Sequence, residues 1–468
     1  MGTGGMALLN RREFIATAAV AAGAKPAVES PRRYLMLDSR VVERAEHVVP
    51  RVGKVKKDPH NPLFAEDKAW EARFDNLYAN VVREPETGLY RCWYSPFIVD
   101  EAVRTTPRSE RKSKPYRALK REMGVCYAES SDGIVWRKPA LGIVEFEGSR
   151  DNNLVVRGPH GAGVFRDARE PDPARRYKMF FQDKATSGAF SPDGIHWSNP
   201  VSFASIGAVG DTHNNAIWAS GISRYVGITR LWDRATRQRL VGRTESEDFL
   251  HWTKAVEVLR ADAKAPESQT YAMPIFEYAG LYLGLLMMFH TPSDTVACEL
   301  AWSADTRRWE RIDPGNPLIP LGGAGACDAG CVYAAATPVA LDDEIRLYHG
   351  ASNGPHTGWR DGFFCLAHLR RDGFAAMEAQ DGGTVITRPV EVTGGRLVVN
   401  ADASSGELRA GVAGDERLQV ERAVPLRGDH VNAVCRWRGA ELKRLRGKRV
   451  QLVFALRSAR IFSFGFEG

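Results

Sequence analysis

Long hydrophobic runs are absent from this 468-residue chain. No stretch approaches the 18 or more apolar residues that a membrane-spanning helix requires, so we expect no integral membrane segment. Cysteine is scarce, and the seven cysteines are odd in number and scattered, which excludes a disulfide framework. Cys327 and Cys331 could pair or share a metal ion, but no second Cys or His pair stands at zinc-binding spacing. We therefore expect buried thiols, no bound metal and no cofactor.

An evenly spread positive charge is also lacking. The formal net charge is +7, but residues 386–468 hold 15 Lys and Arg against 9 Asp and Glu, and residues 104–121 hold 8 against one. The remainder is acidic on balance, which fits a neutral or partly acidic glycan. A nucleic-acid groove needs basic side chains interleaved with exposed aromatics, so we expect no nucleic-acid partner. The run 104–121 is interpreted as a solvated loop, with an anionic-ligand patch as the alternative.

A seven-residue motif, Ser-x-Asp-Gly-x-x-Trp, recurs through the middle of the chain. It is complete at 130–136 and 191–197, degenerate at 246–252 and 303–309, and reduced to its turn at 371–374. Successive Asp residues are 61, 55, 57 and 67 residues apart. A period near 60 in five copies is typical of sheets arranged radially, which hides their edges. The sequence therefore predicts an all-β fold with a five-bladed β-propeller.

The motif has the composition of a tight turn. Asp-Gly supplies the positive φ that such turns need, and Ser and Asp side chains can bond the backbone of the turn itself. The Trp is expected to pack between blades. We interpret the motif as the element that builds the ring and not as the functional site.

Four regions are expected along the chain. Arg11-Arg12, followed by Phe14 and an alanine-rich stretch, resembles a twin-arginine export signal, and predicts a periplasmic or secreted protein; a frayed helical N-terminus is the alternative. Alternating and apolar strands at close spacing after Met377 suggest a small β-sandwich. The predicted regions are a signal peptide at 1–24, a lead-in against the ring at 25–64, the propeller at 65–385 and the sandwich at 386–468.

Carboxylates recur just before the first strand of four blades. They are Asp75, Asp211, Glu267 and Asp328, whereas the second blade has His160 followed by Gly161-Ala162-Gly163 at this place. First strands line the central channel of a propeller, so these carboxylates should converge on one mouth. Asp and Glu are poor strand residues, so sheet propensity does not explain the recurrence. The alternative is that each caps a loop or turn.

The chain resembles exported glycoside hydrolases grouped around families 32, 43 and 68, in particular proteins with a family 32 N-terminal-like domain. The resemblance rests on the Ser-x-Asp-Gly-x-x-Trp repeats, on the segment 86–94 and on the ending from 397–400 through 460–464. It implies a nucleophile or base from a blade-one Asp, a second Asp that stabilises the transition state, and a Glu as the acid. Three motifs of those families are missing from this chain: Asn-Asp-Pro-Asn-Gly in blade one, Arg-Asp-Pro at a first strand, and a Glu-Cys pair. Fructan activity is therefore not implied.

The first hypothesis is a glycoside hydrolase that cleaves an oligo- or polysaccharide with carboxylates of the propeller channel. Asp75 is assigned as nucleophile or base, Glu267 as acid and Asp211 as stabiliser, because such chemistry needs a proton donor and a second carboxylate. Asp328 is the substitute. The expected sugar contacts are Asn76, His213, Asn214, Trp218, Trp232, His290 and Asp328. For Trp218 and Trp232, core packing is an equal alternative.

Two further hypotheses remain. A non-catalytic glycan-binding propeller would keep aromatic side chains at the mouth while its carboxylates are dispersed or salt-bridged. A structural or partner-binding propeller would present an apolar patch and no convergent carboxylates. The sequence leaves the sugar, the linkage, the stereochemical outcome and the oligomeric state open.

Overall fold

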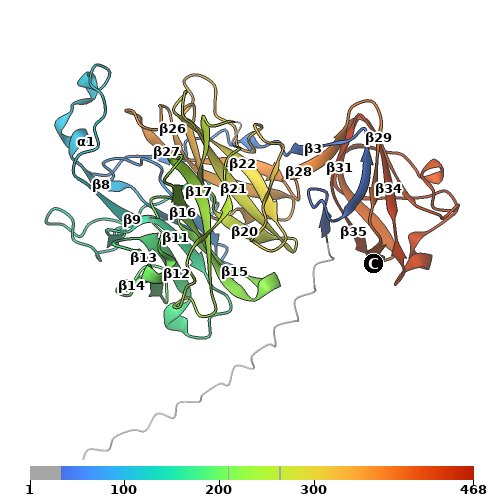
Figure 1. Cartoon of the computed structure of the whole chain (residues 1–468), viewed down its shortest axis with the longest axis horizontal. Coiled ribbons are helices and arrows are strands. Elements are labelled where there is room, and N and C mark those ends of the chain that lie inside the picture. The colour runs from blue at the N-terminus through green and yellow to red at the C-terminus, as the bar shows by residue number, and fades with distance from the viewer. Residues whose placement is uncertain (1–32, 209, 263–264) are drawn as a thin grey trace, which may run out of the picture. The chain divides into compact units, whose positions relative to one another are not determined.

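The computed structural model describes residues 33–208, 210–262 and 265–468, whose regular secondary structure consists almost entirely of strands (Figure 1). The predicted fold class is confirmed. The one α-helix in the described part is α1 (Glu101–Thr105). The 3-10 turns are Arg108–Glu110, Pro173–Arg175, Ala204–Ile206, Ser220–Ile222, Val420–Arg422 and Leu442–Leu445. No helix in these ranges is long and apolar enough to cross a membrane. The predicted export signal lies outside the described residues.

Five antiparallel blades follow one another along the chain. Blade I contains β6 (Asn80–Arg83), β7 (Tyr90–Tyr94), β8 (Phe97–Asp100), β9 (Arg121–Ser130) and β10 (Leu154–Arg157). Blade II contains β11 (His160–Arg166), β12 (Tyr177–Gln182), β13 (Thr186–Ser191) and β14 (Val201–Ser202). Blade III contains β15 (Asn215–Ala219), β16 (Arg224–Asp233), β17 (Gln238–Ser246) and β18 (Val256–Leu259).

Blades IV and V are joined in one sheet by a parallel pair between Val296 and Cys331. Blade IV contains β19 (Ser268–Ala272), β20 (Ile275–Tyr278), β21 (Leu281–His290), β22 (Thr295–Ser303) and β23 (Glu310–Ile312). Blade V contains β24 (Cys331–Ala334), β25 (Val339–Ala340), β26 (Glu344–Ser352) and β27 (Gly362–Arg370). The outer edge of β27 pairs with β4 (Lys56–Lys57) and β5 (Phe64–Ala65) from the start of the chain. The ring therefore closes by pairing an early segment with the last blade.

The repeated motif forms the predicted turn. In the first copy, Asp132 Oδ1 accepts bonds from the backbone N–H of Ile134 and Val135 at 2.8 and 2.9 Å. Ser130 Oγ accepts from Gly133 N–H at 2.8 Å, and Gly133 has φ +76°. The residue after the Asp has positive φ in four copies, even where it is Phe249 or Thr306, so the turn geometry is kept without glycine. In the fifth copy Asp372 itself takes the positive φ.

Each turn is also a contact between neighbouring blades. Its atoms accept hydrogen bonds from the preceding blade, and the donor–acceptor pairs run once around the ring. The pairs are Tyr348 Oη to Gly133 O, Trp93 Nε1 to Gly194 O, Arg175 Nη2 to Asp248 O, Arg243 Nε to Thr306 Oγ1, and Tyr278 Oη to Asp372 Oδ1. The motif therefore builds the ring, as the sequence indicates.

Loss of a motif tryptophan should weaken the ring. Trp252 is buried and packs on Phe180 with ring centroids 5.1 Å apart, so Trp252→Ala is expected to lower the free energy of unfolding by about 3–5 kcal/mol. The matched control is Trp232→Ala, because Trp232 is 38% exposed and should cost much less. Urea denaturation of both variants measures the difference, and equal losses would contradict the packing role.

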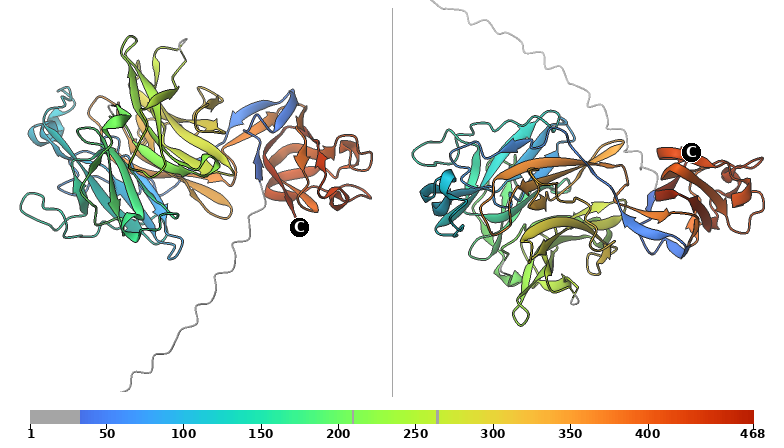
Figure 2. Two further views of the ribbon diagram at one scale, coloured as in Figure 1. Left: turned by 60° about the horizontal axis from the view of Figure 1, so that its bottom comes forward. Right: turned by 90° about the horizontal axis from the view of Figure 1, so that it is seen from above.

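A second, nine-stranded sheet combines both ends of the described chain. Its strands are β1 (Arg33–Leu35), β2 (Val42–Glu46), β3 (Val49–Val52), β28 (Ala375–Ala379), β29 (Gly383–Thr387), β31 (Arg396–Val412), β32 (Leu426–Val434), β34 (Leu452–Arg457) and β35 (Ala459–Glu467). The strands β30 (Val390–Glu391) and β33 (Arg449–Val450) form a separate pair. Figure 2 shows the blue N-terminal strands beside the red C-terminal ones.

This sheet corrects two expectations about the boundaries. The long strand β31 pairs with β35 along its first half and with β34 along its second, so one sheet encloses an apolar core. Because β28 and β29 belong to it, it begins before the predicted boundary at residue 386. The lead-in does not lie wholly against the ring, since β1, β2 and β3 join this sheet and only β4 and β5 join blade V.

All seven cysteines lie in the described part of the chain, and none forms a disulfide. Cys327 does not pair with Cys331. Its Sγ instead lies 3.4 Å from that of Cys365 on β27, while Cys331 lies at the start of β24. In the same ranges, no cluster of three or more His, Cys, Asp or Glu is arranged to hold a metal ion.

Candidate functional site

Asp75 stands at the start of blade I on strained backbone. Asp75, Leu77 and Tyr78 have φ of +47°, +61° and +42°, a region that non-glycine residues rarely occupy. Backbone bonds hold this turn, with Leu77 N–H donating to Phe74 O and Ser95 N–H donating to Leu77 O, both at 2.7 Å. Strained backbone is concentrated at functional sites, where the surrounding structure must enforce it. The position therefore marks Asp75 as a candidate functional residue.

Two arginines hold the Asp75 carboxylate. Arg73 Nε donates to its Oδ1 at 3.1 Å, and Arg360 Nη2 donates to the same atom at 2.8 Å. Burial raises the pKa of Asp75, but the charges of Arg360 and Arg73 outweigh it and leave the pKa below its usual value. The side chain keeps 16% of its surface exposed, so Asp75 is an ionised and largely buried carboxylate.

A hydrogen-bonded chain leads from Asp75 to Asp211. Arg360 Nη2 also donates to Asn76 Oδ1 at 3.1 Å, and Asn76 Nδ2 donates to Tyr271 Oη at 2.8 Å. The backbone carbonyl of Tyr271 accepts from Arg230 Nη2 at 2.7 Å, and Arg230 Nη1 lies 3.4 Å from Asp211 Oδ2. Side chains of blades III, IV and V therefore connect Asp75 with Asp211, and the convergence of the two carboxylates on one mouth stays a prediction.

Asp211 is the more exposed of the two, with 59% of its side chain accessible. His160 Nε2 lies 2.8 Å from its Oδ1. The close contact with His160 lowers the pKa of Asp211, and the charge of Arg230 lowers it further, against the effect of burial. His160 stands where blade II lacks a carboxylate, so that blade contributes the partner of a carboxylate instead.

Glu267 lies at the rim. Its side chain is exposed directly before β19, and its backbone carbonyl accepts from Thr291 N–H at 2.8 Å. Its assignment as the acid stays a prediction. Asp328 is different, because it is 2% exposed and lies beside Lys57 and His349 inside blade V. The expectation that Asp328 reaches the mouth or a sugar is wrong, because Lys57 of the early strand β4 holds it within the blade.

Several predicted sugar contacts are buried. His213 and Asn214 are fully inaccessible, and Asn214 Nδ2 donates to backbone carbonyls such as Gly210 O at 2.8 Å. Asn76 is buried too, and its Nδ2 donates to Tyr78 Oη and Tyr271 Oη. These three residues hold the channel wall together and cannot touch a ligand. Trp218 packs at 5.0 Å on Tyr225, which fits the core-packing alternative.

The exposed candidates line the blade III and IV side of the mouth. Trp232 is 38% exposed, and His290 is exposed with its Nδ1 2.6 Å from Ser293 Oγ. Behind them His356 packs edge-on against Tyr271 and Phe289, with ring centroids 4.7 and 5.1 Å apart. Burial and the Arg360 charge lower the pKa of His356 to about 3, so this ring is neutral at physiological pH.

Sequence reasoning missed Glu66 and misread the basic run. Glu66 Oε1 accepts from the N–H of Phe74, the neighbour of Asp75, at 2.7 Å, and burial raises its pKa to about 7. No motif marks it. In the basic run, the ring centroid of Tyr116 lies 4.0 Å from Arg73 Cζ. The backbone carbonyl of Lys114 accepts from Trp359 Nε1 at 2.8 Å. The run is therefore not a free solvated loop, because it contacts side chains beside Asp75.

Arginines accompany both carboxylates. Arg73 and Arg360 pair with Asp75, and Arg230 pairs with Asp211. Arg239 lies against Trp232 nearby and forms no ion pair within the described residues.

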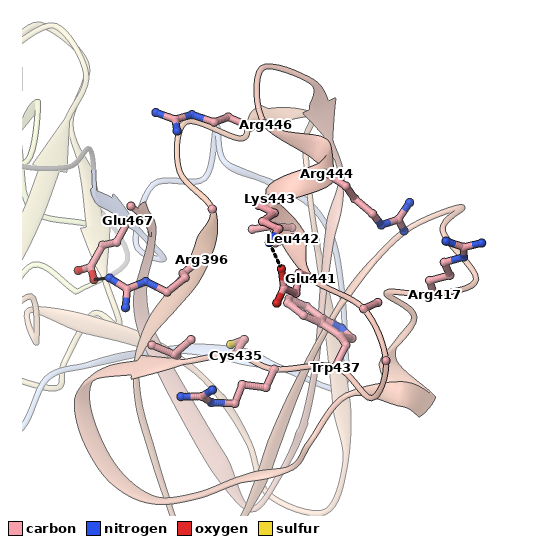
Figure 3. A pocket seen from close by; sticks show the side chains of 16 residues that line it. Arg396, Arg417, Cys435, Trp437, Glu441, Leu442, Lys443, Arg444, Arg446 and Glu467 are labelled. Atoms are coloured by element: carbon pink, nitrogen blue, oxygen red, sulfur yellow. Dashed lines mark ion pairs between the residues drawn. The ribbon is translucent and has the colours of Figure 1, made fainter.

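A separate hollow of about 1050 Å³ lies on the C-terminal sheet, between the start of β31 and the segment 437–446 (Figure 3). Its lining is basic, with Arg396, Arg417, Arg436, Lys443, Arg444 and Arg446 against Glu441 and Glu467. Lys443 pairs with Glu441 at 2.6 Å. Nothing here combines strained backbone with an ionised carboxylate, so the candidate catalytic site is the propeller mouth.

Comparison with known proteins identifies no relative in sequence. No family model matches the chain, and no curated protein matches it. Among solved structures, an N-acetylgalactosamine deacetylase from F. plautii has 13% identity and a TM-score of 0.45, over 70% of this chain and 97% of its own.

Two other solved structures are similar to the same degree. A glycosyl hydrolase from Bacteroides ovatus has 14% identity and a TM-score of 0.44, over 68% of this chain and 94% of its own. A third structure was reported with the GH130 family. That family is described as mannoside phosphorylases that contain glycoside hydrolases targeting β-1,2 mannosidic linkages in Candida mannan. This structure has 15% identity and a TM-score of 0.45, over 68% of this chain and 94% of its own. Similarity at this level assigns neither a family nor an activity, and family 32 membership is not established.

Proposed function

We propose that this protein is a glycoside hydrolase whose active site is the mouth of the propeller. The observation that carries the proposal is Asp75, an ionised and partly exposed carboxylate that Arg73 and Arg360 fix on strained backbone. Glycosidic bond cleavage requires such a group on one side of the anomeric carbon and a proton donor on the other. Trp232 offers an aromatic face on which a sugar ring can stack.

The roles follow from the protonation states. Asp75 acts as nucleophile or base, and Asp211, also ionised, stabilises positive charge that develops on the sugar. The acid must hold a proton at working pH. Glu267 is the candidate from the sequence, and Glu66 is the candidate from the structure, since its raised pKa of about 7 keeps much of it protonated near neutrality.

The proposal is tested by screening the purified protein on aryl glycosides and on neutral, uronate-bearing and sulfated polysaccharides, with release of reducing ends as the readout. We expect hydrolysis of at least one substrate class, abolished by Asp75→Asn. Complete inactivity across the panel would overturn the proposal.

A non-catalytic glycan-binding protein is the second candidate. The observation in its favour is that Asp75 and Asp211 are both paired with arginines, which fixes carboxylates in place without any need for chemistry. Binding of a glycan by an inactive protein, measured on the same panel, would select this alternative.

Export through the twin-arginine route is also proposed, from Arg11-Arg12 and the alanine-rich stretch after them. Replacing both arginines with Lys is expected to retain the protein in the cytoplasm, because this pathway reads the arginine pair. Cell fractionation of the native and Lys-Lys forms measures this. Equal amounts of both forms outside the cytoplasm would reject the proposal.

A further inference from the structure

We infer that the ligand of the propeller mouth is a glycan that carries an anionic group, a carboxylate or a sulfate, and that Arg239 pairs with this group. The inference uses the same site as the proposed function, but it concerns recognition and not bond cleavage. It extends to Arg230, which lies beside Arg239.

Arg239 is a half-buried cation without a carboxylate partner. It stands on β17 opposite Trp232 of β16, and its Cζ lies 4.9, 5.6 and 5.2 Å from the ring centroids of Trp232, Tyr271 and Phe289. Its Nη1 donates to Gln269 Oε1 at 2.8 Å. Within the described residues no carboxylate forms an ion pair with it, and its Nε has no hydrogen-bond partner. Aromatic faces orient this guanidinium but do not neutralise its charge.

Arg230 places a second, buried cation beside Arg239. It is 2% exposed, and its only ion pair in the described part of the chain is the 3.4 Å contact with the half-exposed Asp211. Its Nε also lacks a partner there. Burial and the neighbouring Arg230 lower the pKa of Arg239, which is the mark of two like charges held close together. The two cations share Asp211 as their nearby carboxylate, so an anion at this point would reduce the repulsion between them.

The surroundings indicate that this anion belongs to a sugar. Trp232, beside Arg239, is the accessible aromatic platform of this wall, and ring stacking there places a substituent against the guanidinium. His356 links this wall to Asp75. Its ring packs on Tyr271 and Phe289, the same rings that flank Arg239. Its backbone carbonyl accepts from Arg360, whose Nη2 bonds Asp75, so a glycan bound over this layer of side chains can reach both positions.

The basic hollow on the C-terminal sheet is the competing place for an anionic glycan (Figure 3). Its arginines 417, 436 and 446 are exposed. Water and salt screen exposed charges, so each contributes less than a half-buried one. This hollow supplies the control for the location of binding.

The test is a glycan microarray that presents uronate-bearing and sulfated oligosaccharides beside their carboxyl-reduced and desulfated counterparts. We expect the native protein to prefer at least one acidic glycan over its neutral counterpart. Calorimetry on that glycan should then show about a 10- to 100-fold weaker Kd for Arg239→Gln, the range for loss of a charge-assisted pair. The two arms of the array distinguish carboxylate from sulfate.

Two matched variants remove the same charge elsewhere: Arg234→Gln, exposed in the turn between β16 and β17, and Arg436→Gln in the C-terminal hollow. Both should bind like the native protein.

Three results would each overturn the inference: equal binding of every acidic glycan and its neutral counterpart, an unchanged Kd for Arg239→Gln, or loss of affinity with Arg436→Gln. Preferential binding without hydrolysis would reject the enzyme and keep this inference. Hydrolysis restricted to neutral glycans would do the reverse.

Discussion

Asp75→Asn is expected to lower kcat/KM by about 10³-fold or more on every substrate that the protein hydrolyses, whatever the leaving group. The amide cannot attack the anomeric carbon or accept a proton from water. Asn still presents an oxygen to Arg73 and Arg360, which in the native protein bond one atom, Oδ1. The measurement is steady-state kinetics on the natural glycan and on an activated aryl glycoside.

A structural role of Asp75 is separated from a chemical one by rescue. In Asp75→Ala, azide can enter the vacated space and attack the anomeric carbon of an activated glycoside, while the aryl oxide departs. Recovery of rate together with a glycosyl azide product is expected only if Asp75 works at the reacting carbon. A variant that keeps its fold by circular dichroism and retains near-native activity would reduce Asp75 to an anchor for the two arginines.

The second large effect concerns the acid. Loss of the proton donor should cost about 10²- to 10⁴-fold on a natural glycan, whose leaving oxygen needs protonation. A nitrophenyl glycoside needs little protonation and should be affected far less. Glu267→Gln and Glu66→Gln, each measured on both substrates, therefore identify the acid as the variant with unequal losses. Equal losses on the two substrates would remove that residue from the role.

The pH profile gives an independent criterion for Glu66. The acid is active only while protonated, so with Glu66 in this role kcat falls as pH rises through its pKa of about 7. Burial is the first cause of that raised pKa, opposed by the Phe74 N–H. Glu66→Gln should then remove this alkaline limb. A limb that persists unchanged in Glu66→Gln belongs to another group.

The sequence by itself determined the ring. A turn built from Ser, Asp and Gly depends on bonds between residues two and three apart, such as Ser130 with Gly133, so its geometry is readable from the motif alone. Five copies at a spacing near 60 then define the number of blades. The positions of Asp75 and Asp211 before first strands followed from the same register. The prediction that they converge rests on the meeting of first strands at the centre of a ring.

The tertiary structure decided which of the candidate residues face a ligand and what charge they meet. Arg360 reaches Asp75 from 285 residues away, and Lys57 confines Asp328 from 271 residues away. Three further features likewise depend on neighbours from other parts of the chain: the burial of His213, the unpaired guanidinium of Arg239 and the raised pKa of Glu66. Local sequence encodes turns because their hydrogen bonds are local. Desolvation and ion pairing depend on groups that only folding brings together. The exposure, pairing and protonation of the residues at this mouth could therefore not be predicted from the sequence.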